Sequence, residues 1–397
     1  MKGRKGRVVR GAVLGLLVGA LSIVAAGCGG GDGGGGDAST EIEGLGTSLE
    51  EIQTLARDEG QVNIVQWPLY AQLVDEFTAA TGCKVTLKDA GTSDDMITFM
   101  GTGEYDGIVA SGNATVRLMT TDEVAPINED LIPNYADIQE GLKGQVHNSL
   151  DGVAYGVPHG RGYNPLAWRT DEITTPPDSW GAIWENASDY AGKISIYDDS
   201  IFIADAALWL KATQPELGIE NVYELDDEQF NAAVDLMKQL APNVGEWWAL
   251  YDKQIQSFAN KDVVIGTTWP LQVNLLKADG QPVESVKPKE GATGWSDTWM
   301  VSSKAQNPNC MYLWMNHMAS PEAQAAVAEG FGEAPANPKA CELTKNPNHC
   351  EEQHAEDEAF WEDVYYWTTP VADCGDDRGE VCKTQEDWEA AWTEIRG

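Results

Sequence analysis

The chain has 397 residues, and 63 Asp and Glu against 26 Lys and Arg give it a formal net charge of −37. This length is enough for two lobes of ordinary domain size, each with its own core. A protein this acidic repels nucleic acid and anionic lipid, so we expect no nucleic-acid partner, whereas a cationic ligand would be attracted. We expect the protein to be a monomer.

The N-terminal residues have the pattern of a secreted lipoprotein. A basic start precedes an apolar run at 11–26, which ends in small residues before Cys28 and a glycine-rich stretch. The run is shorter than a membrane-spanning helix requires. We therefore predict a lipoprotein signal peptide at 1–27, lipidation of Cys28 and a flexible Gly-rich tether at 28–48. The lipid would hold the protein at the outer face of the cytoplasmic membrane, extracellular or periplasmic. A signal anchor that stays in the membrane is the alternative.

Beyond the tether, short apolar runs alternate with amphipathic stretches. The runs predict strands at 62–65, 84–87, 105–110, 193–196, 263–267 and 298–302. The amphipathic stretches predict helices at 69–80, 94–100, 202–213, 227–240, 308–318 and 385–395, and Ser320-Pro321 is typical of a further helix start. Strands that alternate with helices indicate an α/β fold with parallel sheets.

The cysteines predict disulfides. Of the seven cysteines, six remain once Cys28 is set aside, and an even number in an exported chain indicates bonded pairs. The simplest pairing has two local loops, Cys341–Cys350 and Cys374–Cys382, which leaves Cys83–Cys310. A zinc site is the alternative, although no two of these cysteines show the close spacing of typical zinc ligands.

Aromatic and acidic residues gather at the predicted strand ends, where open α/β sheets bind ligands. Following this rule along the chain selects Trp67, Tyr70, Ser111, Asn113, Asp198, Asp199, Trp269, Trp295 and Asp297. Trp faces attract ammonium groups and carboxylates accept their hydrogen bonds, so this set predicts a site for an organic cation. The alternatives are that the Trp residues belong to the core and that Asp199 is a helix N-cap.

Several motifs, in order, resemble one protein family over residues 61–341. They are 65–70 around Trp67, 105–111 ending in Ser111, Ser179-Trp180, Tyr197-Asp198-Asp199, and Pro288-Lys289-Glu290-Gly291 followed by Trp295-Ser296-Asp297. These resemble the spermidine/putrescine-binding proteins of polyamine ABC transporters. The resemblance implies a type II periplasmic-binding-protein-like α/β fold, with two hinged lobes, a ligand cleft between them and hinges near residues 160 and 295. It implies a first lobe from 49–162 and 295–337, and a second from 163–294 and the disulfide-bearing 338–397.

The resemblance also implies the site residues and partners. Trp67, Tyr70, Ser111, Trp269 and Trp295 would surround a polyamine, Asp199 and Asp297 would pair with its amines, and Trp367 and Thr369 would add an aromatic and a polar group. The protein would need no cofactor or metal and would not be an enzyme. It would deliver its ligand to the transmembrane permease subunits of an ABC importer.

Three positions depart from the family pattern. Phe202 stands where polyamine binders can place another carboxylate, Asn113 where a tyrosine may be found, and Arg161 where an aromatic residue is expected. A guanidinium suits a carboxylate or phosphonate. The alternative ligand is therefore a zwitterion (an amino acid, betaine or aminophosphonate) bound through Arg161, unless Arg161 points away and pairs with an acidic neighbour.

Other function classes remain as alternatives. A ferric-ion binder of the same fold could use Tyr365-Tyr366, and a metal could bind His349, Glu351, Glu352 and His354. A secreted hydrolase is disfavoured because the sequence has neither a Gly-x-Ser-x-Gly elbow nor a His-Glu-x-x-His helix. A sensor or adhesion lipoprotein would show the same pocket as a transport protein.

Overall fold

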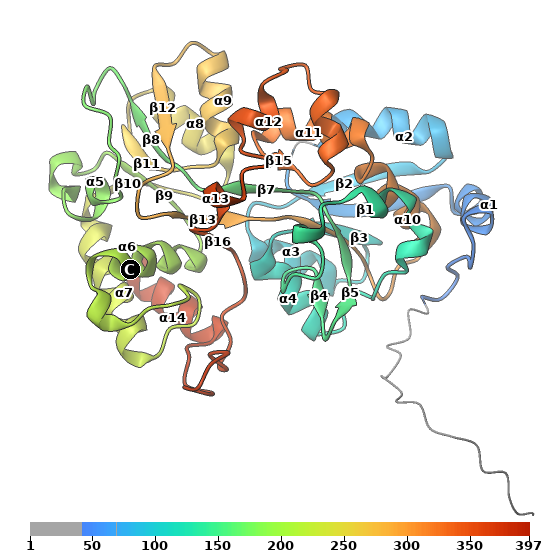
Figure 1. Ribbon diagram of the computed structural model, residues 1–397, viewed down its shortest axis with the longest axis horizontal. Helices are drawn as coiled ribbons and strands as arrows, with labels where there is room; N and C mark the ends of the chain where they lie inside the picture. The colour runs from blue at the N-terminus through green and yellow to red at the C-terminus, as the bar shows by residue number, and fades with distance from the viewer. Residues whose placement is uncertain (1–41, 69) are drawn as a thin grey trace, which may run out of the picture. The chain divides into compact units, whose positions relative to one another are not determined.

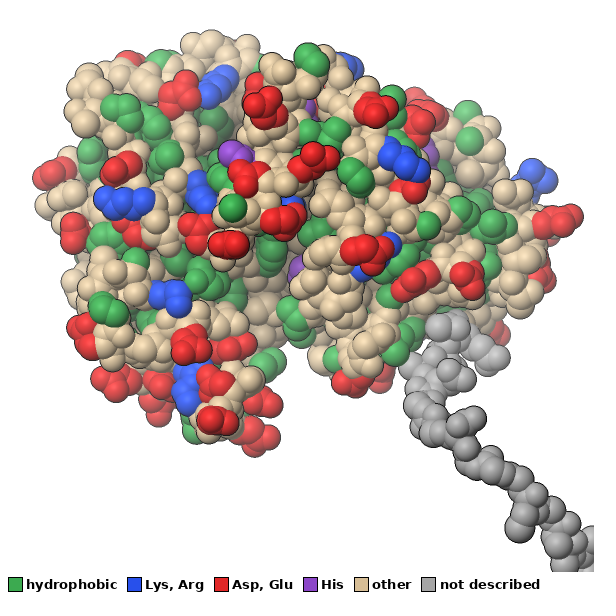
Figure 2. Space-filling model, viewed as in Figure 1, with side chains coloured by type: hydrophobic (Ala, Val, Ile, Leu, Met, Phe, Trp, Pro, Cys, Tyr) green, Lys and Arg blue, Asp and Glu red, His purple; other side chains and the backbone are tan. Residues whose placement is uncertain are grey.

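The computed structural model describes residues 42–68 and 70–397. The predicted signal peptide, Cys28 and most of the tether lie outside the described residues. Figure 1 shows two β-sheets with covering helices, joined by a group of shorter strands between them. Asp and Glu side chains outnumber Lys and Arg on the face shown in Figure 2, as the net charge of −37 leads one to expect.

The first sheet has the strand order β2-β1-β3-β14-β6. Its strands are β1 (Gln61–Gln66), β2 (Lys84–Asp89), β3 (Gly107–Ala110), β6 (Gly156–Pro158) and β14 (Thr298–Val301). The helices that pack on it include α2 (Val74–Thr81), α3 (Ser93–Gly101) and α10 (Pro308–Met318), and α1 (Leu49–Glu59) packs on α10. β1 is parallel to β2 and β3, whereas β14 is antiparallel to both β3 and β6.

The second sheet has the order β10-β9-β11-β8-β12. Its strands are β8 (Leu166–Arg169), β9 (Ile194–Tyr197), β10 (Val244–Trp248), β11 (Ile265–Thr267) and β12 (Val283–Val286). The helices of this part include α6 (Ile203–Thr213), α7 (Asp227–Leu240), α8 (Tyr251–Ala259), α9 (Pro270–Ala278) and α14 (Gln385–Arg396). β9 is parallel to β10 and β11, and β8 is antiparallel to β11 and β12.

A third sheet connects the other two, with the order β15-β7-β13-β16. Its strands are β7 (Gly160–Tyr163), β13 (Ala292–Trp295), β15 (Ala334–Pro335) and β16 (Val364–Tyr366). The chain passes from the first sheet to the second through β7 and returns through β13, and these strands lie between the two sheets in Figure 1. Gly162 on β7 faces Trp295 on β13. A Cβ at Gly162 would lie 2.2 Å from the Trp295 ring, so a glycine lets this indole lie flat on the neighbouring strand.

The predicted α/β class is confirmed, and each predicted strand and helix overlaps an observed one. The expectation of parallel sheets is only half right, because both sheets are mixed. β8 and β14 each follow directly on a connecting strand, and each is antiparallel to its neighbours in its sheet. The strands of the connecting sheet were not predicted. Their composition, such as Gly160-Arg161-Gly162-Tyr163, lacks the apolar alternation of a strand.

The three predicted disulfides are confirmed: Cys83–Cys310, Cys341–Cys350 and Cys374–Cys382. The first ties the end of α2 to the start of α10 and is fully buried. The segment 338–397, predicted as one unit, has two sets of contacts. Its first part packs on α11 (Pro321–Phe331) and the connecting sheet, whereas α14 packs on α7. Within residues 42–68 and 70–397, no helix has the length and apolar character needed to span a bilayer.

Candidate functional site

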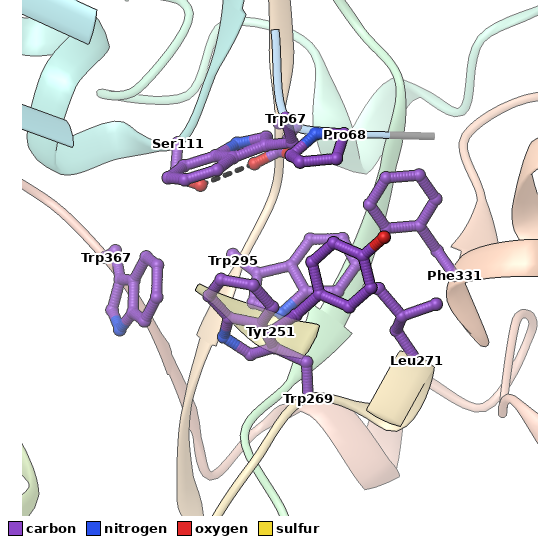
Figure 3. A pocket seen from close by; sticks show the side chains of 10 residues that line it. Trp67, Pro68, Ser111, Tyr251, Trp269, Leu271, Trp295, Phe331 and Trp367 are labelled. Carbon is purple, nitrogen blue, oxygen red and sulfur yellow. Dashed lines mark hydrogen bonds between the residues drawn. The ribbon is translucent and has the colours of Figure 1, made fainter. Parts of the chain in front are cut away.

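A pocket lies where the first sheet, the second sheet and the connecting sheet meet, and it has about 400 Å³ of space between its lining atoms, part of it open to solvent. It is lined by Trp67, Pro68, Ser111, Tyr251, Trp269, Leu271, Trp295, Asp297, Phe331 and Trp367 (Figure 3). Six of these were predicted from the sequence: Trp67, Ser111, Trp269, Trp295, Asp297 and Trp367. They come together because each follows or precedes a strand that ends at this junction.

Asp297 is the charged residue of the pocket. It lies between β13 and β14, is only 3 % exposed, and accepts a 2.5 Å hydrogen bond at Oδ1 from the hydroxyl of Ser111, drawn as a dashed line in Figure 3. Burial raises its pKa to about 7, and the Ser111 hydrogen bond acts in the opposite direction. Among the described residues, no lysine, arginine or histidine lines this pocket. An ionised Asp297 therefore needs a cation from outside the protein.

Four indole rings line the pocket: Trp67, Trp269, Trp295 and Trp367. Trp67 from the first sheet meets the edge of Trp269 from the second, with ring centroids 5.9 Å apart. Trp367 stands to the left of this pair in Figure 3. It stacks on Tyr197, with centroids 5.7 Å apart and planes 7° apart. Such aromatic surfaces can pack against methylene groups and attract an ammonium group through the ring quadrupole.

Four lining residues were missed by the sequence reasoning: Pro68, Tyr251, Leu271 and Phe331. Tyr251 starts α8 just after β10, and Leu271 lies in the first turn of α9 just after β11. The strand-end rule would have selected Leu271 had it been extended two residues into the helix after the predicted strand 263–267, whereas no strand was predicted directly before Tyr251. Phe331 ends α11, far from any strand end that the sequence predicted.

Tyr70 does not line the pocket but lies behind it. It is fully buried, and its ring packs against His159, Trp299 and Phe331. Nearby, Glu333 and His159 approach to 3.5 Å. Burial raises the pKa of Glu333 well above its usual range and lowers that of His159 to about 3, so this is a contact between two neutral groups rather than an ion pair.

Asn113 and Thr369 hold the loop that carries Trp367. The Thr369 hydroxyl donates to the backbone carbonyl of Asn113 at 3.1 Å, and neither residue lines the pocket. The adjacent Gly112 lies against the Trp367 backbone. A Cβ at this position would be 1.9 Å from the Trp367 carbonyl oxygen, so only glycine allows this close approach. These contacts fix the position of Trp367 rather than touch a ligand in the pocket.

Asp199 also lies outside the pocket. It is the N-cap of the short helix at Ser200–Phe202, and its Oδ1 accepts a hydrogen bond from the Ile201 amide. Its carboxylate borders a separate acidic cavity with Asp94, Asp198 and Glu389. The observed contacts of Asp199 are therefore those of the alternative prediction, a helix N-cap.

Arg161 points away from the pocket. Its guanidinium pairs with Glu358 at 2.6 Å, donates to the Ala355 carbonyl at 3.1 Å and lies 4.5 Å from the centre of the Trp361 ring. β7 places this side chain on the other face of the connecting sheet, next to Tyr366. Of the two alternatives for Arg161, the structure therefore shows the one in which it pairs with an acidic neighbour outside the ligand pocket.

The residues of the two metal hypotheses have other partners. The His349 ring bonds to the Glu333 carbonyl at 2.9 Å, and His354 stacks on Phe360. Tyr366 stacks on the Trp361 ring and borders the cavity that holds Arg161, not the pocket at Asp297. In the described part of the chain, no group of three or more His, Cys, Asp or Glu side chains is placed to hold a metal ion.

The family model described as bacterial extracellular solute-binding protein matches residues 72–351. The spermidine/putrescine-binding periplasmic protein of Escherichia coli (strain K12) is 23 % identical over 283 residues, which cover 70 % of this chain and 78 % of that protein. A solved structure described as a putative spermidine/putrescine ABC transporter from Listeria monocytogenes superposes with a TM-score of 0.72 at 18 % identity. It covers 85 % of this chain and 99 % of that one.

A second solved structure is MotA from A. tumefaciens B6 in complex with glucopine. It has a TM-score of 0.67 at 19 % identity, with 85 % of this chain and 100 % of that chain covered. At these identities the two structures establish the fold. The family model covers more than half of the chain, which therefore belongs to the bacterial extracellular solute-binding proteins, a family of non-enzymatic solute-binding proteins.

Proposed function

We propose that this protein binds a polyamine, putrescine or spermidine, in the pocket at Asp297 and delivers it to the permease of an ABC importer. The observation that carries the proposal is a buried carboxylate, Asp297, in a pocket lined by four tryptophans and by no cationic residue among those described. A primary ammonium group can donate to the carboxylate while the methylene chain packs on the indoles. The relatives named for binding spermidine and putrescine support the same ligand class.

Both main sheets contribute to the pocket, so ligand binding would favour the arrangement in which they lie close together. Trp67 and Trp269 meet across the pocket, and the Tyr197 hydroxyl donates to the Gly91 carbonyl at 3.4 Å. A ligand that contacts both sides stabilises this closed arrangement by its differential affinity for it. We further propose that lipid on Cys28 holds the protein at the outer face of the cytoplasmic membrane, beside the permease.

Calorimetric titration of the purified protein with putrescine, spermidine, GABA, glycine betaine and 2-aminoethylphosphonate tests the ligand class. We expect 1:1 binding of a polyamine and a change in Trp fluorescence, because four indoles line the pocket. Binding confined to ligands with an anionic group would overturn the proposal. It would favour the second candidate, a zwitterionic solute. The glucopine complex of MotA shows that a protein with this fold can bind a ligand other than a polyamine.

A further inference from the structure

A second buried carboxylate, Asp205, borders a compartment that shares Trp269 and Trp367 with the pocket at Asp297. The compartment has about 240 Å³ of space between its lining atoms, part of it open to solvent. Asp205 lies in the first turn of α6 and is 3 % exposed. Asp205 was not among the site residues predicted from the sequence, and a carboxylate this buried needs polar partners.

The polar atoms around Asp205 form an ordered chain of hydrogen bonds. The Thr293 hydroxyl donates to Oδ1 of Asp205 at 3.0 Å, and the Asn164 amide nitrogen donates to the Thr293 oxygen at 2.8 Å. This chain fixes the carboxylate on one side.

Two oxygen atoms that line the compartment have no hydrogen-bond donor from any residue that the structure describes. Oδ1 of Asn164 and Oγ1 of Thr267 are buried, line the compartment, and have no partner among the described residues. A buried acceptor without a partner costs about 1–3 kcal/mol. A primary ammonium group has three donors and no acceptor. Asp205, Asn164 and Thr267 together offer it three oxygens.

Most of the remaining lining is aromatic, with Ile201 and Thr268 as the exceptions. Tyr197 and Trp248 end β9 and β10, and they join Trp269 and Trp367 in its lining. In the described part of the chain, no lysine, arginine or histidine lines it. The boundary with the first pocket therefore consists of ring surfaces that can pack against methylenes but offer no counter-charge for an anion.

We propose that Asp205 holds the second ammonium group of a linear dication whose first ammonium group lies at Asp297. The methylene chain passes between Trp269 and Trp367. This assignment rests on the proposed function, because it places the other end of the ligand in the same site. It makes Asp205 a specificity-determining residue that separates diamines from monoamines of equal length.

The charge state of Asp205 supports this assignment. Burial raises its pKa to about 8, and the hydrogen bond from Thr293 opposes the shift. The buried titratable groups near the compartment include Tyr197, Tyr223 and Asp199, whereas Lys211 of α6 and the charged residues of α7 lie toward the surface. Burial raises the pKa of both tyrosines well above their usual range, so they stay neutral, and that of Asp199 to about 7. An ammonium group entering the compartment would therefore ionise Asp205 and release its proton.

The test compares putrescine with n-butylamine, which has the same carbon chain and one ammonium group. Calorimetry is run at pH 7 on wild type, on Asp205→Asn and on Asp235→Asn, a control that removes an exposed carboxylate from α7. We expect Asp205→Asn to weaken putrescine binding at least tenfold and to reduce the putrescine-to-butylamine affinity ratio accordingly, with no change in Asp235→Asn. Putrescine binding as tight in Asp205→Asn as in wild type would overturn the assignment. Failure of wild type to bind either amine would instead refute the proposed function.

A second measurement needs no variant and holds even if Asp205→Asn does not fold. Titrations of wild type at pH 6, in two buffers of different ionisation enthalpy, count the protons released on binding. We expect putrescine to release about one more proton than butylamine, because only the diamine ionises Asp205. Equal proton release by the two amines would show that Asp205 keeps its proton and takes no part in binding.

Discussion

The hydroxyl of Ser111 donates a 2.5 Å hydrogen bond to Asp297, which lies 186 positions further along the chain. Antiparallel pairing of β3 with β14 creates this contact, because Ala110 is the register partner of Thr298. Ser111 and Asp297 are the next residues outward on the two strands. The bond occupies Oδ1 and orients the carboxylate, so its other oxygen is available to a ligand in the pocket.

Replacement of Asp297 by Asn should weaken amine binding most. The substitution keeps the shape and removes the charge, and hydrogen bonds to charged groups contribute about 1.5–3 kcal/mol, which is roughly tenfold to a hundredfold in affinity. Ser111→Ala should have a smaller effect, since it removes only the orienting bond. Calorimetric affinities for putrescine measure both, with Asp235→Asn as the charge-matched control. Unchanged affinity in Asp297→Asn would mean that the ligand does not reach this carboxylate.

Replacement of Arg161 by Ala should lower stability and leave ligand affinity unchanged. The guanidinium is buried, pairs with Glu358 and donates to the Ala355 carbonyl on the far side of the connecting sheet. Loss of these bonds should reduce the free energy of unfolding by about 1–3 kcal/mol. Glu358→Gln should cost less, because the side chain of Glu358 is 71 % exposed. Denaturant unfolding measures the stability and putrescine titration measures the affinity. A weaker affinity in Arg161→Ala would mean that Arg161 takes part in ligand binding.

Titration of Asp297 should lower the stability of the ligand-free protein as the pH rises from about 4 to about 7, whereas the lowered pKa of the buried His159 acts in the opposite direction. Burial raises the pKa of Asp297 in the folded protein to about 7, above its value in the unfolded chain, so the folded state binds the extra proton between these values. The contribution of this group is complete below pH 4 and is lost as the pH passes 7. Asp205 and Asp199, with pKa values of about 8 and about 7, act in the same direction.

Thermal unfolding across this pH range measures the effect in wild type and in Asp297→Asn. The variant should show a flatter profile than wild type, by about 2–4 kcal/mol over the range. A saturating polyamine should flatten the wild-type profile as well, because the ammonium group stabilises the ionised carboxylate. Parallel profiles for wild type and Asp297→Asn would contradict a buried, protonated Asp297.

Replacement of Gly162 by Ala should disturb the pocket without touching its polar groups. The new Cβ would lie 2.2 Å from the Trp295 ring, so the indole must move. Overpacking of this kind costs about 1–3 kcal/mol of stability, and displacement of Trp295 should also weaken ligand binding. Gly101→Ala is the matched control, because a Cβ there meets nothing within 4 Å. Equal stability and affinity in the two variants would mean that Trp295 can move aside freely.

The sequence alone determined the alternation of strands and helices, the three disulfides and most of the aromatic lining. These features are local or follow from simple counting: apolar periodicity marks strands and helices, and strand ends mark the ligand-binding edge of the sheets. Trp67, Ser111, Trp269, Trp295 and Asp297 could be selected in this way because each sits within three residues of a predicted strand.

Only the tertiary structure decided which polar groups reach the ligand pocket. Arg161 and Asp199 lie close in sequence to strand ends, yet neither lines the pocket. The Arg161 side chain pairs with Glu358, and Asp199 caps a helix N-terminus. Asp205 lies in the nearly all-apolar helix Ile203–Thr213, where a carboxylate in the first turn is typical of a stabilising helix start. Its role depends on which face of α6 turns toward Thr293 and Trp367, and that orientation is set by packing between segments far apart in the chain.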